Sequence, residues 1–282
     1  MPGSRSEPEP SIGFSDAVKR KLRQPAELRA AHHSGSVRAD GSLDIRRQGG
    51  CVVGIITRPS AHNRIGGSMA IALIELAEAV EDDDTVRALA ITGAGSSFCA
   101  GFDSDVDSRV VETLNSVSKP TIAVFNGDAL DEGLELALAL DLRISLRSAR
   151  FALTQLQRGF LPQFGGTQRL PRLVGAAHAL QMILGGGPIN GKEAMRLGLV
   201  TYLAEDRKRL AQAMTDLFAT IESRGPLGVR LVKEAVRKGF DMTLEQGIRL
   251  EEDLYALLQT TADRAEGVRA FLEKRKPIFK GF

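Results

Sequence analysis

The chain of 282 residues is long enough for one large domain with a smaller appendage, and a hydrophobic content of 43% provides for a sizeable core. A net charge of +2, the absence of Trp and an aromatic content of 5% argue against a nucleic-acid-binding protein. No apolar run is long enough for a transmembrane helix, so no membrane partner is expected. The start of the sequence lacks the apolar core of a secretory signal, and Cys51 and Cys99 suggest no disulfide framework, which together predict a cytoplasmic protein.

Composition divides the chain into three expected parts. Residues 1–41 are predicted to be a partly disordered N-terminal arm, because the arm begins with a stretch rich in Pro, Ser and Glu. A core follows over residues 42–225, and a helical C-terminal region over 226–282. His32 and His33 lie in the arm without a supporting Cys or carboxylate cluster, so a solvated pair is favoured over a metal site, and no metal ligand is predicted.

Strand and helix patterns alternate in the first half of the core, which predicts an α/β fold with largely parallel strand pairing. β-Branched residues on both sides of Gly49 and Gly50 predict a β-hairpin at its start. From about residue 170 the pattern becomes mostly helical. The expected strands are 43–48, 51–57, 86–95, 121–127 and 142–146, and the expected helices are 71–85, 134–140, 170–185, 191–198, 209–223, 226–239, 244–260 and 263–276.

Acidic residues open an apolar helix in the stretch VFNGDALDEGLELALALD, residues 124–141. Asp131 and Glu132 stand where first-turn acids complement the helix dipole. Glu135 is surrounded in sequence by leucines, which indicates burial. A buried carboxyl group has a raised pKa that suits proton transfer, so Glu135 is the strongest catalytic candidate.

Two glycine-rich loops accompany this helix. In ITGAGSSFCAGFDSD, residues 91–105, a strand runs into a loop whose backbone N–H groups can approach a ligand, although the G-x-G-x-x-G spacing of a dinucleotide site is absent. In FALTQLQRGFLPQFGGTQRLPRLVG, residues 151–175, Gly and Pro shape a long loop before a helix, and a purely structural connection is the alternative interpretation.

Taken in order, these stretches resemble the enoyl-CoA hydratase/isomerase, or crotonase, family from about residue 50 to the C-terminus. The motifs that carry the resemblance are ITRPSAHN at 56–63, TGAGSSFCAGFD at 92–103, KPTIAVFNGDALDEGLELALALDLRI at 119–144, LPQFGGTQRLPRLVG at 161–175, GLV at 198–200 and FLEKRKPIFKG at 271–281.

The resemblance implies an α/β fold built as a spiral of ββα turns, with a helical C-terminal region that joins subunits into trimers or into hexamers of two trimers. It implies acyl-CoA thioester substrates and no cofactor beyond the coenzyme A that the substrate carries. Carried over by position, Ala100 and Glu132 supply two backbone N–H groups as an oxyanion hole for the thioester oxygen. The positions implied to contact coenzyme A are Ala61, Ala100, Gly101, Phe102, Asp103, Phe271 and Lys274, the last two often reaching a neighbouring subunit.

The sequence departs from the family pattern at the site itself. Gln155 stands where hydratases have their second glutamate, and an amide neither gives nor takes a proton at neutral pH. Asp131 and Glu132 stand where glycines are common, and Asp128 where an apolar or aromatic residue is common. These carboxylates could replace the missing acid, recognise a polar acyl group or face solvent.

An enoyl-CoA hydratase-like enzyme is therefore the first hypothesis. The alternatives are an acyl-CoA isomerase, decarboxylase or hydrolase that uses a single carboxylate, and a non-catalytic acyl-CoA-binding homologue.

Overall fold

The computed structural model describes residues 41–282, so nearly all of the predicted N-terminal arm, including His32 and His33, lies outside the described residues. A six-stranded sheet forms the centre, in the order β1-β2-β3-β5-β7-β10. Strands β2 to β10 of this sheet are parallel, and β1 joins β2 through the expected antiparallel hairpin at its edge. The strands are β1 (Ser42–Gln48), β2 (Cys51–Thr57), β3 (Ala88–Gly93), β5 (Thr121–Phe125), β7 (Leu142–Leu146) and β10 (Tyr202–Ala204).

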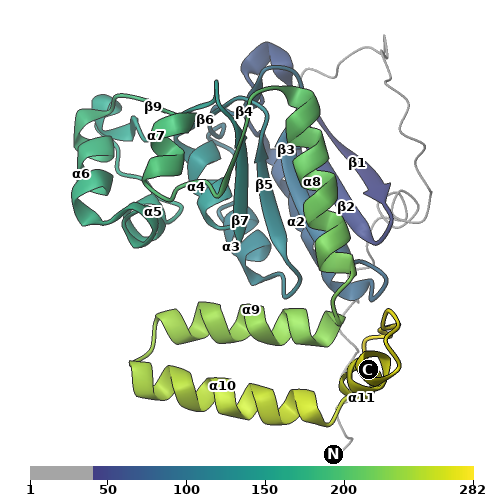
Figure 1. The fold of residues 1–282 in the computed structure, drawn as a ribbon. Helices are drawn as coiled ribbons and strands as arrows, with labels where there is room; N and C mark the ends of the chain where they lie inside the picture. Colours follow the sequence, from purple (N-terminus) through teal and green to yellow (C-terminus); the bar gives the residue numbers. More distant parts are fainter. Residues whose placement is uncertain (1–40) are drawn as a thin grey trace, which may run out of the picture.

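Helices cover both faces of this sheet because alternate strand residues point to opposite sides. One face packs against α8 (Arg207–Glu222), and the other against α2 (Gly67–Asp82), α3 (Arg109–Ser116) and α4 (Glu132–Leu138) (Figure 1). Val52 and Val53 show the alternation, since the first belongs to the α2 side and the second to the α8 side. The α/β fold with largely parallel pairing is thus confirmed.

A second, smaller sheet was not predicted. Its strands have two or three residues each and follow the order β4-β6-β8-β9, with β4 (Ser97–Cys99), β6 (Asp128–Leu130), β8 (Arg150–Ala152) and β9 (Ile189–Asn190). Segments this short carry no recognisable alternation, so sequence patterns assign them to loops. The chain leaves the carboxyl ends of β3, β5 and β7 to enter this sheet, which brings the three loops with unusual residues together.

The helices between β8 and β10 differ from the predicted pattern. One helix was expected over 170–185, but the chain forms two, because Gly175 adopts a φ of 81° that interrupts the helix. The segments are α5 (Gly166–Val174), α6 (Ala176–Gly185) and α7 (Gly191–Arg196), with 3₁₀ turns at Pro59–Ala61 and Gln155–Arg158.

Three helices form a layer beneath the amino ends of the central strands: α9 (Pro226–Phe240), α10 (Leu244–Gln259) and α11 (Ala262–Leu272) (Figure 1). Lys233 and Arg237 of α9 hold this layer to the core through Asp141, at 2.5 and 3.3 Å. Among the helices of residues 41–282, none is both long and apolar enough to cross a membrane.

Candidate active site

Glu135 lies at the centre of the site, fully buried on α4. Its Oε1 accepts hydrogen bonds of 2.8 Å from the backbone amides of Phe164 and Gly166. A side chain at Gly166 would place a Cβ 2.9 Å from Oε1, so this close approach requires glycine. Burial raises the pKa of Glu135 to about 7, with the two amides acting in the opposite direction and the charge of Glu132 adding to the rise. A carboxyl group with such a pKa can both take and give a proton near neutral pH.

Gln155 is the direct neighbour of Glu135. Its Nε2 donates to Glu135 Oε2 at 2.9 Å, and its side chain is buried. Its Oε1 is also buried and has no hydrogen-bond partner within the part of the chain that the structure describes. A buried acceptor without a donor is destabilising, so this oxygen is a place where a water molecule or a substrate group would be held.

Asp131 turns away from this pair and anchors the segment that carries Gln155. Its carboxylate accepts hydrogen bonds from the backbone N–H of Thr154 at 2.5 Å and from the Thr154 hydroxyl, and pairs with Arg158 at 2.9 Å. Asp131 has φ 49° and ψ −124°, a backbone conformation that favours glycine and is strained for a side chain. The carboxylate that was considered for the acyl pocket therefore serves to tie α4 to the turn at Gln155.

Ala100 does not direct its amide toward α4. Its N–H donates to the carbonyl of His62 at 3.0 Å, within a loop where His62 and Asn63 both have positive φ. The amide expected as an oxyanion donor thus has the His62 carbonyl as its acceptor in this structure, and its oxyanion role stays a prediction. The Phe102 amide, two residues later, instead faces the start of α4 and donates to Glu132 Oε2 at 3.2 Å.

Glu132 has both its backbone N–H and its side-chain carboxylate near the start of α4, where the Phe102 amide also lies. Its backbone N–H stands in the first turn of α4 and has no acceptor among residues 41–282, as expected for a helix N-terminus. Its half-buried carboxylate lies against Gly101 and accepts the hydrogen bond from the Phe102 amide. Arg64 approaches Gly101 from another direction and donates to the carbonyls of Ala100 and Phe102.

The loop of residues 98–103 is fixed by contacts with the segment of residues 58–64. Asp103 pairs with Arg58 at 2.5 Å and with Arg64 at 3.1 Å, and these two cations lower its pKa even though desolvation opposes them. Asn63 is fully buried and donates to the carbonyls of Ala94 and Ser97. Ala61 lies in the adjoining 3₁₀ turn. These contacts fix the loop that carries the Phe102 amide.

Asp128, another of the unusual acids, also contacts neither Glu135 nor Gln155. It accepts hydrogen bonds from the backbone and the guanidinium of Arg150, at 3.0 and 2.6 Å, and so joins β6 to β8. A role for Asp128 in the acyl pocket is therefore not supported. Cys99, the last residue of β4, is buried, and burial raises the pKa of its thiol to about 12, so it behaves as a small apolar residue rather than a nucleophile.

Comparison with known proteins identifies the family. A model of the family described as Enoyl-CoA hydratase/isomerase matches residues 46–281. The chain is 38% identical over 240 residues to the crotonyl-CoA hydratase of Syntrophomonas wolfei, covering 79% of this chain and 92% of the relative. It is 33% identical over 293 residues to the human mitochondrial methylglutaconyl-CoA hydratase, covering 97% and 82%. The crystal structure of enoyl-CoA hydratase from Bacillus anthracis superposes with a TM-score of 0.82 at 32% identity, covering 85% of this chain and 99% of that one.

The chain belongs to the enoyl-CoA hydratase/isomerase family. It is accordingly an acyl-CoA enzyme of the crotonase type, with hydratase-like relatives. The crotonase fold expected from the motifs is confirmed by the structural match.

Two residues that the crotonase resemblance assigns to coenzyme A lie far from Glu135 in this chain. Phe271 is at the end of α11, largely exposed, and Lys274 follows with a φ of 52°. Helix α11 lies on one side of the layer beneath the sheet, whereas α4 and α5 lie on the other side, above α9 (Figure 1). There Arg237 of α9 donates to the Ala139 carbonyl, and Arg172 of α5 pairs with Asp241 at 3.5 Å. Within one copy of this crotonase chain, the fold does not bring Phe271 and Lys274 to the candidate active site.

Several residues of this crotonase site could not be predicted from the sequence. Asn63, Arg64 and Arg158 each act across more than 20 residues of chain, so no local pattern marks them. The orientation of the Phe102 amide toward Glu132 could not be predicted either, because the direction of a backbone N–H within a loop is invisible in a sequence. The one available signal was the unbroken run of small and polar residues around Asn63, which indicates a tight loop.

Proposed function

We propose that this chain is an enoyl-CoA hydratase-like enzyme that holds the thioester oxygen between two backbone amides and moves protons through Glu135. The observation that carries the proposal is the buried Glu135 carboxyl group, with a pKa of about 7, beside the open N-terminus of α4. As the thioester becomes an enolate, negative charge grows on its oxygen, and preorganised amides stabilise that charge.

Phe102 and Glu132 are the proposed pair of amide donors. The Phe102 N–H has only a side chain as its present acceptor, and the Glu132 N–H has none within residues 41–282. The thioester oxygen would take the place of the Glu132 carboxylate at the Phe102 amide. Loss of one such donor lowers transition-state stabilisation by about 3–4 kcal/mol.

Proton transfer is proposed to run through one carboxyl group. In hydration, ionised Glu135 removes a proton from water as the water oxygen bonds to the β-carbon, and the C=C electron pair moves toward the thioester. Glu135 then returns that proton to the α-carbon. Gln155 contributes by holding Glu135 Oε2 and by offering its unpartnered Oε1 as an acceptor for the attacking water.

Gln155 also supports a second candidate, because a site with one ionisable carboxyl group suits isomerisation, decarboxylation or hydrolysis through the same enolate. The products distinguish these reactions by mass. Hydration adds one water, isomerisation leaves the mass unchanged, decarboxylation removes CO₂, and hydrolysis releases free coenzyme A.

The decisive experiment incubates the purified protein with crotonyl-CoA and a panel of longer and more polar enoyl-CoAs, and follows the loss of conjugated-thioester absorbance together with product mass. Glu135→Gln should abolish turnover while acyl-CoA binding persists. Turnover that survives this substitution would show that the proton role is misassigned. Tight acyl-CoA binding without turnover, in the wild type and in Glu135→Gln alike, would favour the non-catalytic homologue.

Assembly into a trimer or a hexamer is part of the proposal. Val232, Val236 and Phe240 form an exposed apolar stripe along α9, each separated by one helical turn, and Leu244 continues it at the start of α10. Such a stripe is typical of a subunit interface. Phe271 needs a second copy of the chain if it is to reach a coenzyme A molecule. Light scattering of the purified protein tests the subunit number, and Val236→Glu should reduce it.

The cytoplasmic location expected from composition remains a prediction. The human relative described above is named as mitochondrial, so the name of a relative does not decide the compartment. Fractionation of cells that express the full chain would measure it.

A further inference from the structure

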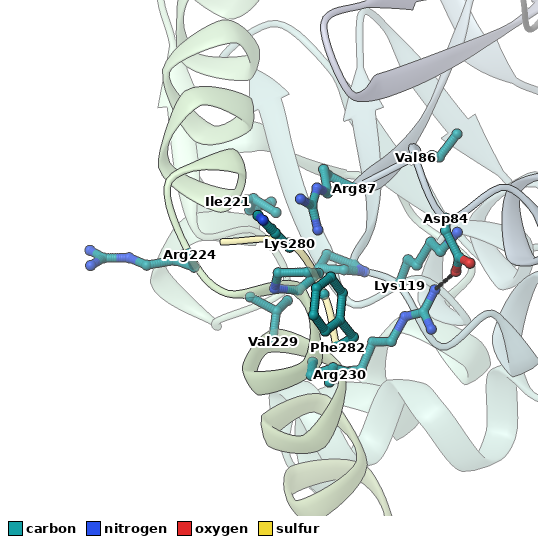
Figure 2. Close-up of a pocket in the computed structure, with 14 residues that line it drawn as sticks. Asp84, Val86, Arg87, Lys119, Ile221, Arg224, Val229, Arg230, Lys280 and Phe282 are labelled. Carbon is teal, nitrogen blue, oxygen red and sulfur yellow. Dashed lines mark ion pairs between the residues drawn. The ribbon is translucent and has the colours of Figure 1, made fainter. Parts of the chain in front are cut away.

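A cavity of about 200 Å³ lies at the end of the core opposite the candidate active site. It is enclosed by the segment before β3, the start of β5, the end of α8, the first turn of α9 and the last residues of the chain (Figure 2). Strands β3 and β5 begin here, whereas the loops that carry Phe102 and Glu135 follow their carboxyl ends. The cavity is therefore separate from the acyl-CoA site of the same chain.

Positive charge dominates this cavity. Arg87 and Lys280 point into it, and within residues 41–282 neither side chain has a hydrogen bond to an acceptor or an ion pair (Figure 2). Arg230 pairs with Asp84 at 3.7 Å, but Asp84 is almost fully exposed, so the pair is weak. Lys119 forms the buried floor of the cavity, with its amine on the carbonyls of Val80 and Asp83.

Basic side chains outnumber acidic ones among the residues that line the cavity, where Asp84 is the acid. Burial, followed by the charge of Arg230, lowers the pKa of Lys119, while the charges of Glu81, Asp84 and Asp83 act in the opposite direction. Glu222, at the end of α8, already accepts a hydrogen bond of 2.5 Å from the Gly50 amide. An anion that enters the cavity would gain from this excess of basic side chains, chiefly from Arg87 and Lys280.

An apolar wall stands beside the charges. Phe282 lies across the middle of the cavity with Lys280 above its ring at 6.0 Å, and Ile221 and Val229 complete the wall (Figure 2). A bare inorganic ion would use the cations but not this wall. A ligand with a phosphate and an attached planar or apolar group would use both.

We propose that this cavity binds a small phosphomonoester, with the phosphate between Arg87 and Lys280 and its planar group against Phe282. A guanidinium and an ammonium group together supply several donors to one phosphate. The first turn of α9 borders the cavity, and its dipole adds to the positive potential.

Calorimetric titration of the full chain with AMP, inorganic phosphate and adenosine tests the proposal. AMP should bind more tightly than inorganic phosphate, adenosine should not bind measurably, and added salt should weaken AMP binding. The double variant Arg87→Met with Lys280→Met should weaken AMP binding at least about tenfold, because two charge-assisted hydrogen bonds are removed.

Arg224→Met is the matched control, because Arg224 borders the cavity but its side chain points away from it (Figure 2). It should bind AMP as the wild type does. Thermal melting and crotonyl-CoA turnover verify that each variant is folded, and the single variant Arg87→Met replaces the double variant if that one is not. The proposal is overturned if AMP shows no binding at millimolar concentration, if adenosine binds as well as AMP, or if the Arg87 variants retain wild-type affinity. An equal loss in Arg224→Met would overturn it too.

Discussion

Glu135→Gln should make this protein more stable at alkaline pH while it removes the proposed activity. The carboxyl group of Glu135 is fully buried, and its pKa rises from an ordinary value of 4.5 to about 7. Because the pKa is higher in the folded protein than in the unfolded chain, the stability linked to Glu135 is complete below pH 4.5 and is lost as the pH rises through 7. A glutamine does not ionise, so the variant does not lose this stability.

The difference between the folded and unfolded pKa values of Glu135 sets the size of the stability change. It corresponds to about 3 kcal/mol in the free energy of unfolding, which the wild type retains near pH 4.5 and lacks above pH 8. The geometry allows the substitution, since a carboxamide oxygen can still accept from the amides of Phe164 and Gly166. The new NH₂ group would donate to Gln155 Oε1 after a flip of that amide, which gives the unpartnered oxygen a donor.

Urea unfolding and thermal melting at pH 5 and pH 8 measure the effect. The melting temperature of Glu135→Gln should exceed that of the wild type by several degrees at pH 8, and by little at pH 5. Glu193→Gln is the control, because Glu193 is only partly buried, pairs with Arg196 and has a lowered pKa, so it should show no gain at alkaline pH. If Glu135→Gln gains nothing at pH 8, or gains the same at both pH values, the buried carboxyl group does not carry the raised pKa and the reasoning fails.

Four further outcomes are expected. A pH–rate profile of kcat/KM should fall about tenfold per pH unit below pH 7, because only ionised Glu135 accepts a proton; a flat profile would exclude it as the base. Gln155→Glu should raise hydration and move this profile to higher pH, since a second carboxyl group would then lie within about 3 Å of Glu135 and disfavour its ionisation. Glu132→Gly should lower KM for enoyl-CoA about tenfold by freeing the Phe102 amide, and a loss of kcat instead would identify Glu132 as a catalytic acid. Asp131→Asn should lower the free energy of unfolding by about 1–3 kcal/mol in urea titrations, because a buried carboxylate loses charge-assisted hydrogen bonds; an unchanged midpoint would contradict that role.

Local patterns were sufficient for the main elements. The hairpin at Gly49 and Gly50, the parallel strands and the C-terminal helices follow from residue types within a few positions of one another. The small second sheet did not follow, because strands as short as β9 depend on partners that are distant in sequence. The single helix expected over 170–185 was wrong for a local reason, the positive φ of Gly175.

For the candidate site too, the sequence determined some features and the tertiary structure determined others. The sequence alone determined that Glu135 is buried among leucines, that Gln155 replaces a carboxylate and that the motifs are those of the crotonase family, because residue identity and local spacing are written in the chain. The tertiary structure decided that the Ala100 amide is engaged by His62, that the Phe102 amide faces Glu132, and that Asp131 anchors Thr154 and Arg158. Backbone direction and the choice among several acceptors are set by segments that meet only after folding, so the partners of each N–H group and carboxylate are properties of the fold.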